Sequence, residues 1–405
     1  MRRLDDYRDV VGNEIVEEIQ EKAKRLRGLR VLHINSTSDG GGVAEILNSL
    51  VPLMSSLGLE VDWKVLNGTP DFFAVTKQFH NALQGGPADH GDDAEQLYLR
   101  TNEAFSACTD IGADCVIVHD PQPLPLVACR NHSDRWVWRC HVDLSHPNEM
   151  LWGFLKPLVT QFDMAVMSSE AYMKDDLPLE QRIIFPAIDP LSPKNADLSH
   201  EEASRWVRKA GVPTDKPFIT QVSRMDVWKD PEGLLDVLEH VREKVDCRLV
   251  YCYSSATDDP EGDEMLSRTY RKAGKLVDSG DVVFVEGKNQ SLVNAIQRLS
   301  SVVLQKSTRE GFCLCITEAL WKETPVVATN VGGIPIQLKE AENGFLVDPD
   351  DAEGFADKVI ELLQNPDSAE RLGKRGRETV RQNFLITRLI SDHLDLLEDL
   401  FRSPN

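Results

Sequence analysis

The first half of the chain alternates short apolar runs with longer amphipathic stretches. Such runs, rich in Val and Ile, are typical of buried strands. They occur at residues 31–35, 61–65, 115–119, 136–140, 164–167 and 183–185. Helix-length segments such as 43–57 separate them. Alternating strand and helix predict a parallel sheet covered by helices on both faces.

The same alternation returns in the second half, after a segment rich in proline. Pro186, Pro190 and Pro193 interrupt the pattern and predict a linker at 186–195. Apolar runs then recur at 218–222, 247–251, 282–285, 301–305 and 325–329. The pattern therefore predicts an α/β fold with two doubly wound, Rossmann-like domains facing each other across a cleft. We expect the domains at 1–190 and 191–380, with a C-terminal helical segment at 381–405 that can pack back on the first domain.

The length of the chain agrees with two domains, and its charge limits the kinds of partner that it can bind. A chain of 405 residues is longer than a domain with a single hydrophobic core usually is, and its 41% hydrophobic residues suffice to form two cores. The first thirty residues are charged and contain no apolar run of the length of a signal peptide or membrane span. With 66 acidic against 45 basic residues the formal net charge is −21. We expect a cytoplasmic protein with neither a nucleic-acid partner nor a membrane partner.

The cysteines do not predict a metal site. None of the eight cysteines forms a Cys-x-x-Cys pair, and no histidine lies at the spacing of a zinc ligand. Most occur in apolar or strand-like stretches, where a buried, reduced thiol is the expected state. We therefore expect no metal and no disulfide framework.

Polar residues follow several of the predicted strands. Asp120 comes directly after the strand at 115–119, and His141 and Asp143 come directly after the strand at 136–140. Ligands of open parallel sheets bind beyond the carboxyl ends of the strands. A neutral histidine there can donate to a sugar hydroxyl, although each histidine taken alone fits a structural role as well.

A glycine-rich turn follows the first strand. Gly40, Gly41 and Gly42 lie between Asn35 and the predicted helix at 43–57. They favour either a simple tight turn or a ligand that approaches the main chain closely. They form neither G-x-G-x-x-G nor a P-loop, which argues against an NAD-dependent oxidoreductase.

Two charged clusters follow strands of the second half. Arg224 and Lys229 come after the strand at 218–222, where a guanidinium and an ammonium could converge on one anion. Glu310 and Glu318 come after the strand at 301–305, the first on a loop and the second on a helix expected from residue 316. Free N–H groups at that helix start can hold a diphosphate, while the carboxylates can accept hydrogen bonds from sugar hydroxyls.

Taken together, these residues resemble a known set. The glycine-rich loop, the strand-end histidine, Ser-Arg-x-Asp-x-x-Lys at 223–229, Arg-Glu-Gly-Phe at 309–312 and the second glutamate eight residues after the first resemble the retaining glycosyltransferases of the GT-B fold. Further stretches, among them 79–85, 118–123, 138–141, 188–192, 258–262 and 317–322, resemble the branch of trehalose glycosyltransferring synthases, with glucosylglycerol-type synthases as close relatives. The resemblance runs from about residue 4 to the C-terminus.

The resemblance implies a role for each position. Arg224 and Lys229 would hold the donor diphosphate, Glu310 the transferred glucose and Glu318 the ribose. His141 would contact the glucose near its 6-hydroxyl. The sugar and the phosphate would contact the main chain of Gly311, Phe312, Cys313 and Leu314. The diphosphate would also contact the turn at Gly41 and Gly42. Asp120, Asp143 and Asn35 would face the acceptor.

The expected reaction is retaining transfer of glucose from an NDP-glucose to glucose, which forms trehalose. Domain 1–190 would be the acceptor side and domain 191–380 the NDP-sugar side. Similar enzymes need neither metal nor cofactor, and a homodimer is compatible with the resemblance. A small polyol such as glycerol is the alternative acceptor. Segments 67–93 and 254–263 are expected to shape the acceptor pocket. A non-catalytic nucleotide-sugar sensor is an alternative of another class.

Overall fold

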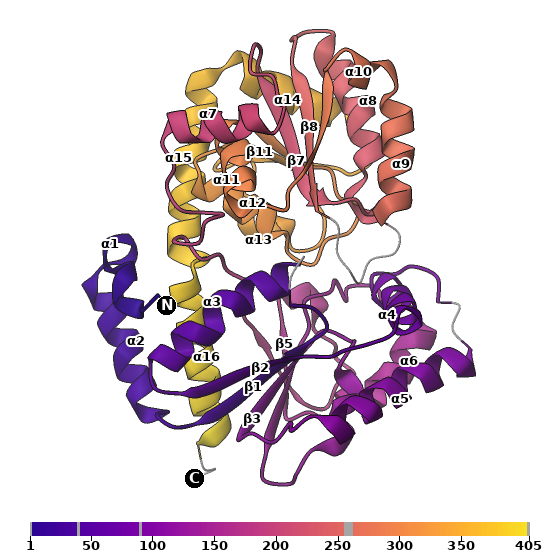
Figure 1. Cartoon of the computed structure of the whole chain (residues 1–405), viewed down its shortest axis with the longest axis vertical. Helices are drawn as coiled ribbons and strands as arrows, with labels where there is room; N and C mark the ends of the chain where they lie inside the picture. Colours follow the sequence, from indigo (N-terminus) through magenta and orange to yellow (C-terminus); the bar gives the residue numbers. More distant parts are fainter. Residues whose placement is uncertain (1, 39–40, 89–90, 255–261, 403–405) are drawn as a thin grey trace. The chain divides into compact units, whose positions relative to one another are not determined.

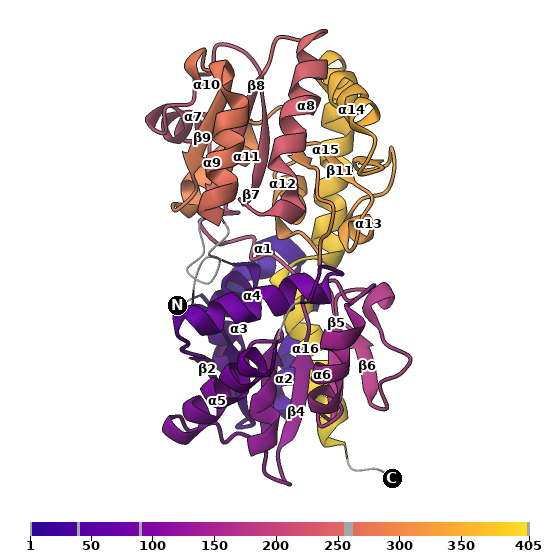
Figure 2. The same ribbon diagram turned by 90° about the vertical axis from the view of Figure 1, so that its right-hand side faces the viewer.

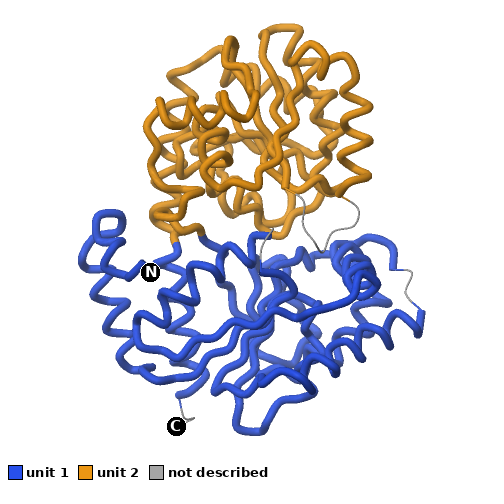
Figure 3. The backbone as a smooth tube through the Cα atoms, viewed as in Figure 1, with its two compact units in different colours: residues 1–187, 257–259, 386–405 blue, residues 188–256, 260–385 orange. Residues whose placement is uncertain are grey.

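The computed structural model describes residues 2–38, 41–88, 91–254 and 262–402. The chain forms two compact units (Figure 3). Unit 1 comprises residues 1–187 and 386–405 together with 257–259, and unit 2 comprises 188–256 and 260–385. The boundaries thus lie at 187/188 and 385/386, beside the expected 190 and 380. The last helical segment, expected at 381–405, belongs to unit 1 from residue 386 onward.

Unit 1 is built on a six-stranded parallel sheet with the order β2-β1-β3-β4-β5-β6 (Figure 1). The strands are β1 (Arg30–Asn35), β2 (Glu60–Val65), β3 (Cys115–His119), β4 (Arg135–Arg139), β5 (Met164–Met167) and β6 (Glu180–Ile183). In register, His33 lies beside Ile117 and His119 beside Arg139. The three central strands β1, β3 and β4 therefore end close to one another, with their carboxyl ends at one edge.

Helices cover both faces of this sheet. They are α1 (Arg8–Val11), α2 (Asn13–Arg25), α3 (Gly42–Ser56), α4 (Pro70–Leu83), α5 (Asp92–Cys108), α6 (Glu149–Val159) and α16 (Ile386–Phe401), with short 3₁₀ turns at Leu4–Tyr7, Leu124–Cys129 and Glu170–Tyr172. On one face, Leu32 and Val116 pack against Phe79 of α4 and Tyr98 of α5. On the other face, α16 packs against α2 and α3, and Lys22 of α2 forms an ion pair with Asp395 of α16 at 2.8 Å.

Unit 2 repeats this architecture with the strand order β12-β11-β10-β7-β8-β9. The strands are β7 (Phe218–Arg224), β8 (Arg248–Ser254), β9 (Val282–Glu286), β10 (Val302–Gln305), β11 (Val326–Thr329) and β12 (Phe345–Val347). All of their pairings are parallel. The expected α/β class with two Rossmann-like sheets is thus confirmed.

The helices of unit 2 also lie on both faces of its sheet (Figure 2). They are α7 (His200–Lys209), α8 (Pro231–Arg242), α9 (Gly262–Ala273), α10 (Lys275–Asp278), α11 (Gln290–Leu299), α12 (Leu314–Trp321), α13 (Ile334–Gln337), α14 (Ala352–Gln364) and α15 (Pro366–Asn383), with a 3₁₀ turn at Val227–Lys229. Leu235 of α8 and Phe355 of α14 pack on one face. Val207 of α7 and Ile296 of α11 pack on the other.

One local prediction from the sequence was wrong. The strand expected at 183–185 ends at Ile183, and it begins at Glu180 because polar residues 180–182 pair with β5 despite their composition.

The proline-rich segment at 186–195, predicted as a linker, contains the boundary between the two units at 187/188. It forms a hydrogen-bonded turn in which Ser192 and Asn195 donate to the carbonyl of Asp189, and Ile188 donates its N–H to Phe384 at 2.9 Å.

Candidate functional site

Each sheet reverses its strand order at one point, and the predicted site residues follow the strands around it. In unit 1 the chain moves from β1 outward to β2 and then returns to β3 on the other side of β1. In unit 2 it moves from β7 to β8 and β9 and then returns to β10. Ligands of open α/β sheets bind outside the carboxyl ends of the strands at such a switch point.

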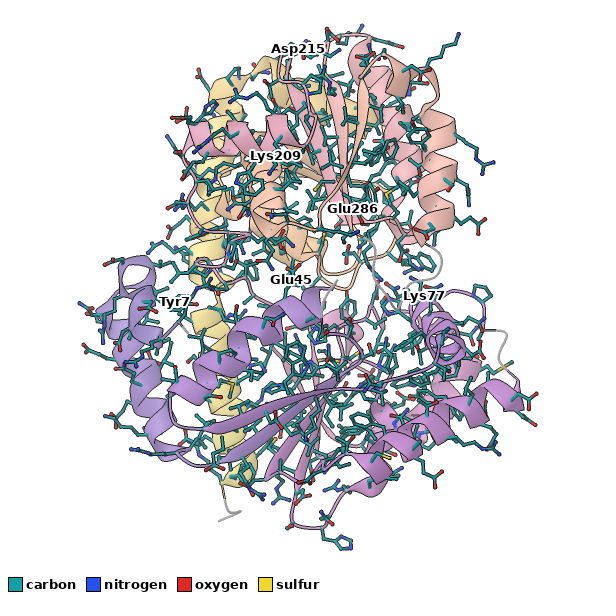
Figure 4. All side chains as sticks on the ribbon, in the orientation of Figure 1. Tyr7, Glu45, Lys77, Lys209, Asp215 and Glu286 are labelled. Atoms are coloured by element: carbon teal, nitrogen blue, oxygen red, sulfur yellow. The ribbon has the colours of Figure 1, made fainter. Side chains whose placement is uncertain are left out.

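The glycine turn after β1 leads directly into α3. Gly41 is the N-cap of this helix, with extended dihedral angles (φ −148°, ψ 160°), and Gly42 is its first residue. Glu45 of α3, which Figure 4 labels, donates its N–H to the Gly41 carbonyl at 3.1 Å. A Cβ built on Gly41 meets no heavy atom of the described residues within 4 Å. Neither its dihedral angles nor its described neighbours therefore require glycine, and the close approach of a ligand to this turn stays a prediction. Gly40 lies outside the described residues.

We predict that Gly41→Ala leaves the fold intact but weakens donor binding. Alanine adopts these dihedral angles freely, and Ala for Gly at an N-cap costs about 1 kcal/mol, a cost that the control below shares. A methyl group facing the diphosphate should raise KM for the nucleotide sugar by roughly 10-fold, or about 1.4 kcal/mol. Gly91→Ala is the matched control, because Gly91 is also an extended N-cap whose Cβ meets nothing within 4 Å. Equal donor KM values in the two variants would contradict the assignment.

The three predicted acceptor residues are held by the protein itself. Asn35 is buried, donates to the carbonyl of Thr37 and accepts from the indole of Trp63 at 2.7 Å. Asp143 accepts from both the N–H and the hydroxyl of Ser145 through its Oδ1. These contacts shape the loops after β1 and β4, so the role of Asn35 and Asp143 in acceptor binding remains a prediction.

Asp120 has an unusual backbone and a contact to the next predicted residue. It adopts a positive φ of 62°, which L-residues other than Asn, Asp and His seldom adopt. Its Oδ1 accepts the backbone N–H of His141 at 2.7 Å, and its carbonyl accepts from the indole of Trp138. Asp120 and His141, which follow neighbouring strands, are thus joined.

His141 is the last member of a row of three histidines. His33 Nδ1 lies 3.0 Å from His119 Nε2, and His119 Nδ1 lies 3.1 Å from His141 Nε2. Burial, together with Arg139 and neighbouring histidines, holds the pKa of His119 and His141 well below the usual value. Burial also lowers the pKa of His33 to about 3. All three imidazoles are therefore neutral at neutral pH.

In unit 2, Arg224 is the last residue of β7, Lys229 lies in the turn that follows it, and Glu310 lies after β10. Lys229 forms a buried ion pair with Glu310. Burial alone would lower the pKa of Lys229, but the Glu310 carboxylate outweighs this and, with the nearby thiol of Cys313, raises it to about 12. Arg224 Nη2 lies 3.6 Å from Asp226 Oδ2, and its side chain keeps 31% of its exposure. Arg224 is thus the more accessible cation, while Lys229 is a permanent charge fixed beside Glu310.

We predict that Lys229→Met lowers both activity and stability. It would leave the Glu310 carboxylate buried without its cation, which costs about 3 kcal/mol. Lys229→Met/Glu310→Gln removes both charges, so it should recover most of that loss in thermal unfolding while remaining inactive. Lys272→Met is the control, because it breaks an exposed ion pair with Asp236, worth at most about 1 kcal/mol. A Lys229→Met protein that unfolds at the parent temperature would contradict the prediction.

The segment around α13 fixes the loop at 310–314 through hydrogen bonds and close packing. Gly333 donates its N–H to the Glu310 carbonyl at 3.1 Å, and Gln337 donates to the carbonyl of Phe312. A Cβ on Gly333 would lie 2.4 Å from the Gly311 carbonyl oxygen, so only glycine fits there. Leu314 opens α12, and the free N–H groups of a first helical turn can receive an anion.

Glu318, on α12, is nearly inaccessible and is bound through both oxygens. Oε1 pairs with Lys194 at 2.9 Å, and Oε2 accepts from Gln297 at 3.0 Å. Only 1% of the Glu318 side chain is exposed, against 13% of Lys194. A ribose hydroxyl that reaches this carboxylate therefore has to share it with Lys194. Sequence reasoning missed Lys194, Gln297 and Gln337, because neither their residue type nor their spacing marks them.

Comparison with known proteins gives two family matches. Residues 33–174 match the family described as the trehalose synthase N-terminal domain, and residues 202–379 match the glycosyl transferases of group 1. A trehalose synthase from Thermococcus litoralis is 43% identical over 98% of this chain and 97% of its own length. One from Rubrobacter xylanophilus is 45% identical, with the same coverage.

The chain belongs to the trehalose synthase family of glycosyltransferases. A UDP-forming α,α-trehalose-phosphate synthase from Burkholderia xenovorans superimposes with a TM-score of 0.73, covers 93% of this chain and 100% of that one, and is 14% identical. This likeness confirms the GT-B fold class expected from the sequence.

Cys313 has an unusual backbone conformation. Its φ is 74° and its ψ is 76°, and it is the N-cap of α12. This left-handed conformation suits glycine best. Cys313 adopts it nonetheless. Burial raises the pKa of the Cys313 thiol well above its usual value.

Two kinds of feature are absent from the described part of the chain. None of its helices is long and apolar enough to cross a bilayer. No group of three or more His, Cys, Asp or Glu side chains in it is arranged to hold a metal ion.

Proposed function

We propose that the protein is a retaining glucosyltransferase that moves glucose from an NDP-glucose to glucose and releases trehalose and the nucleoside diphosphate. The observation that carries the proposal is similarity to trehalose synthases along almost the whole chain. The cationic side chains after β7 and the buried carboxylates after β10 support it, since they suit a sugar diphosphate. Trehalose synthases that rearrange another disaccharide would not need these groups.

In the proposed reaction the bond between glucose C1 and the phosphate oxygen breaks while the acceptor oxygen bonds to C1 on the same face. Arg224 and Lys229 stabilise the charge on the departing diphosphate, and its oxygen takes the acceptor proton. Glu310 and His141 hold the hydroxyls of the glucose, and Glu318 holds the ribose. Because the cations are protein side chains, the reaction runs without a metal ion or other cofactor.

Location and assembly complete the proposal. All eight cysteines are free thiols, as expected of a protein in the reducing cytoplasm. NDP-glucose and a small sugar are its partners, and neither nucleic acid nor membrane takes part. A homodimer agrees with this activity, and sedimentation of the purified protein would test it.

The deciding experiment is a product assay. ADP-, UDP- and GDP-glucose are each incubated with glucose, glycerol, glycerate, fructose or glucose 6-phosphate, with and without EDTA. NMR should identify α,α-trehalose from glucose, with the donor configuration retained and no effect of EDTA. Glucosylglycerol as the main product would replace glucose by glycerol as acceptor. Trehalose formed from maltose alone, and not from any NDP-glucose, would overturn the proposal.

A further inference from the structure

A row of imidazoles leads from the interior of unit 1 to the predicted glucose contact. His33 is in register with Ile117, two residues before His119, and His119 is in register with Arg139, two residues before His141. Side chains in register across parallel strands, and those two residues apart along a strand, lie on the same face of the sheet. The three rings therefore step across one face, one strand at a time, toward the carboxyl ends. His33 is completely buried, His119 nearly so, and His141 partly exposed.

The hydrogen bonds in this row can be arranged in only two ways. Each neutral imidazole carries one N–H donor and one bare nitrogen acceptor, and each of the two N···N contacts needs one of each. If His33 donates from Nδ1 to His119 Nε2, then His119 donates from Nδ1 to His141 Nε2, and His141 carries its hydrogen on Nδ1. If the direction is reversed, the hydrogen of His33 lies on Nε2 and His141 Nδ1 is bare.

The buried end of the row favours the first arrangement. His33 Nε2 is buried and has no hydrogen-bond partner among the described residues. In the second arrangement this atom would be an orphaned N–H donor, which is rarer in protein interiors than an unsatisfied acceptor. No hydrogen bond joins this atom to the neighbouring His393, whose ring centroid lies 6.2 Å from that of His33.

We propose that His33 and His119 are positioning residues for glucosyl transfer. Through the row of hydrogen bonds they hold the hydrogen of His141 on Nδ1, the nitrogen that the row does not use, so that His141 presents a donor to a sugar hydroxyl. This inference rests on the proposed function for the identity of the sugar, but its tautomer assignment does not. Such fixed donors need no reorganisation when the substrate binds.

Two substitutions at His33 separate hydrogen bonding from packing. Asparagine places an amide donor close to the position of Nδ1, whereas leucine fills the space without a donor. His33→Leu should lower kcat by about 3- to 10-fold, as expected for one hydrogen bond, with little change in KM for the donor. His33→Asn should restore kcat to within about twofold of the parent. His393→Leu, which replaces the adjacent imidazole outside the row, is the matched control and should keep the parental kcat.

Two further measurements test whether His33 acts through His141 or only through packing. Nitrogen-15 NMR of the histidine rings, with His141→Gln used for assignment, should place the hydrogen of His141 on Nδ1 in the parent and in His33→Asn. In His33→Leu it should show a mixture of the two neutral tautomers. In a His141→Ala background, His33→Leu should cause no further loss of kcat. A bare Nδ1 in the parent, or a full additional loss in that background, overturns the proposal. If the parent transfers no glucose from NDP-glucose, the proposed function fails while the NMR result still decides the tautomer.

Discussion

Arg224→Ala is expected to lower kcat for trehalose formation by roughly 10²- to 10³-fold, which is the usual cost of losing one preorganised donor to a developing negative charge. Arg224 ends β7 at the switch point of unit 2 and keeps 31% of its side-chain exposure. Its Nη2 lies 3.6 Å from Asp226 Oδ2, which places the guanidinium at the end of the strand.

The stability of the fold should survive this change. Asp226 still caps the turn at Val227–Lys229 through Trp228, so the thermal midpoint should stay close to that of the parent. Arg224→Lys should recover only part of kcat, because an ammonium cannot form the two parallel bonds of a guanidinium. Arg271→Ala, an exposed arginine of α9 that bonds the Ser267 carbonyl, is the control. Turnover by Arg224→Ala within about threefold of the control would remove Arg224 from the diphosphate site.

The second large effect is a loss of stability in mild acid. Burial lowers the pKa of His33 to about 3 and that of His393 to about 4, whereas both titrate near 6.5 in the unfolded chain. Below pH 6.5 these histidines therefore bind protons in the unfolded chain but not in the folded protein. The free energy of unfolding falls as the pH decreases, until the pH reaches the pKa values of the folded protein. Each group contributes about 1.4 kcal/mol per pH unit. The loss should be steep between pH 6.5 and 4.5, where unfolded-state carboxylates are still ionised.

Substitution of His393 removes the contribution of one histidine to this pH dependence. His393→Leu should flatten the fall in unfolding free energy between pH 6.5 and 4.5 by about one proton per molecule. The positive charges of Arg139 and Arg388 near His393 add to the cost of protonating it. His200→Leu is the control, because His200 is exposed at the start of α7. Identical acid profiles for the two variants would show that His393 titrates normally in the fold.

The sequence predicted the strands and the loops that follow them because both depend on local pattern. Buried runs such as 115–119 and 218–222 have the periodicity and length of strands in a covered sheet, and the structure places β3 and β7 there. Once strands and helices alternate, the loops after them are the expected ligand-binding positions. Arg224, Lys229 and Glu310 could therefore be chosen before their distances were known.

What the sequence could not reveal depends on contacts between distant residues. Lys194 lies in a segment whose prolines predicted a linker, yet its ammonium pairs with Glu318 on α12. Gln337 and Gly333 hold the loop at 310–314 although neither residue type marks a binding site. The row of histidines needs the strand order β1-β3-β4 as well as the register. Such features follow from tertiary packing, which local periodicity does not encode.

Unit 1 is discontinuous in the sequence, and this has a consequence for synthesis of the protein. The ribosome releases residues 1–187 first, but α16, whose residues 386–401 fill one face of that unit with Leu389, Ile390 and Leu394, emerges last. Domains usually fold in the order of translation. Here unit 1 lacks α16 until residues 386–401 have been synthesised, so one of its apolar faces stays uncovered while unit 2 is translated. We therefore expect unit 2 to finish folding before unit 1.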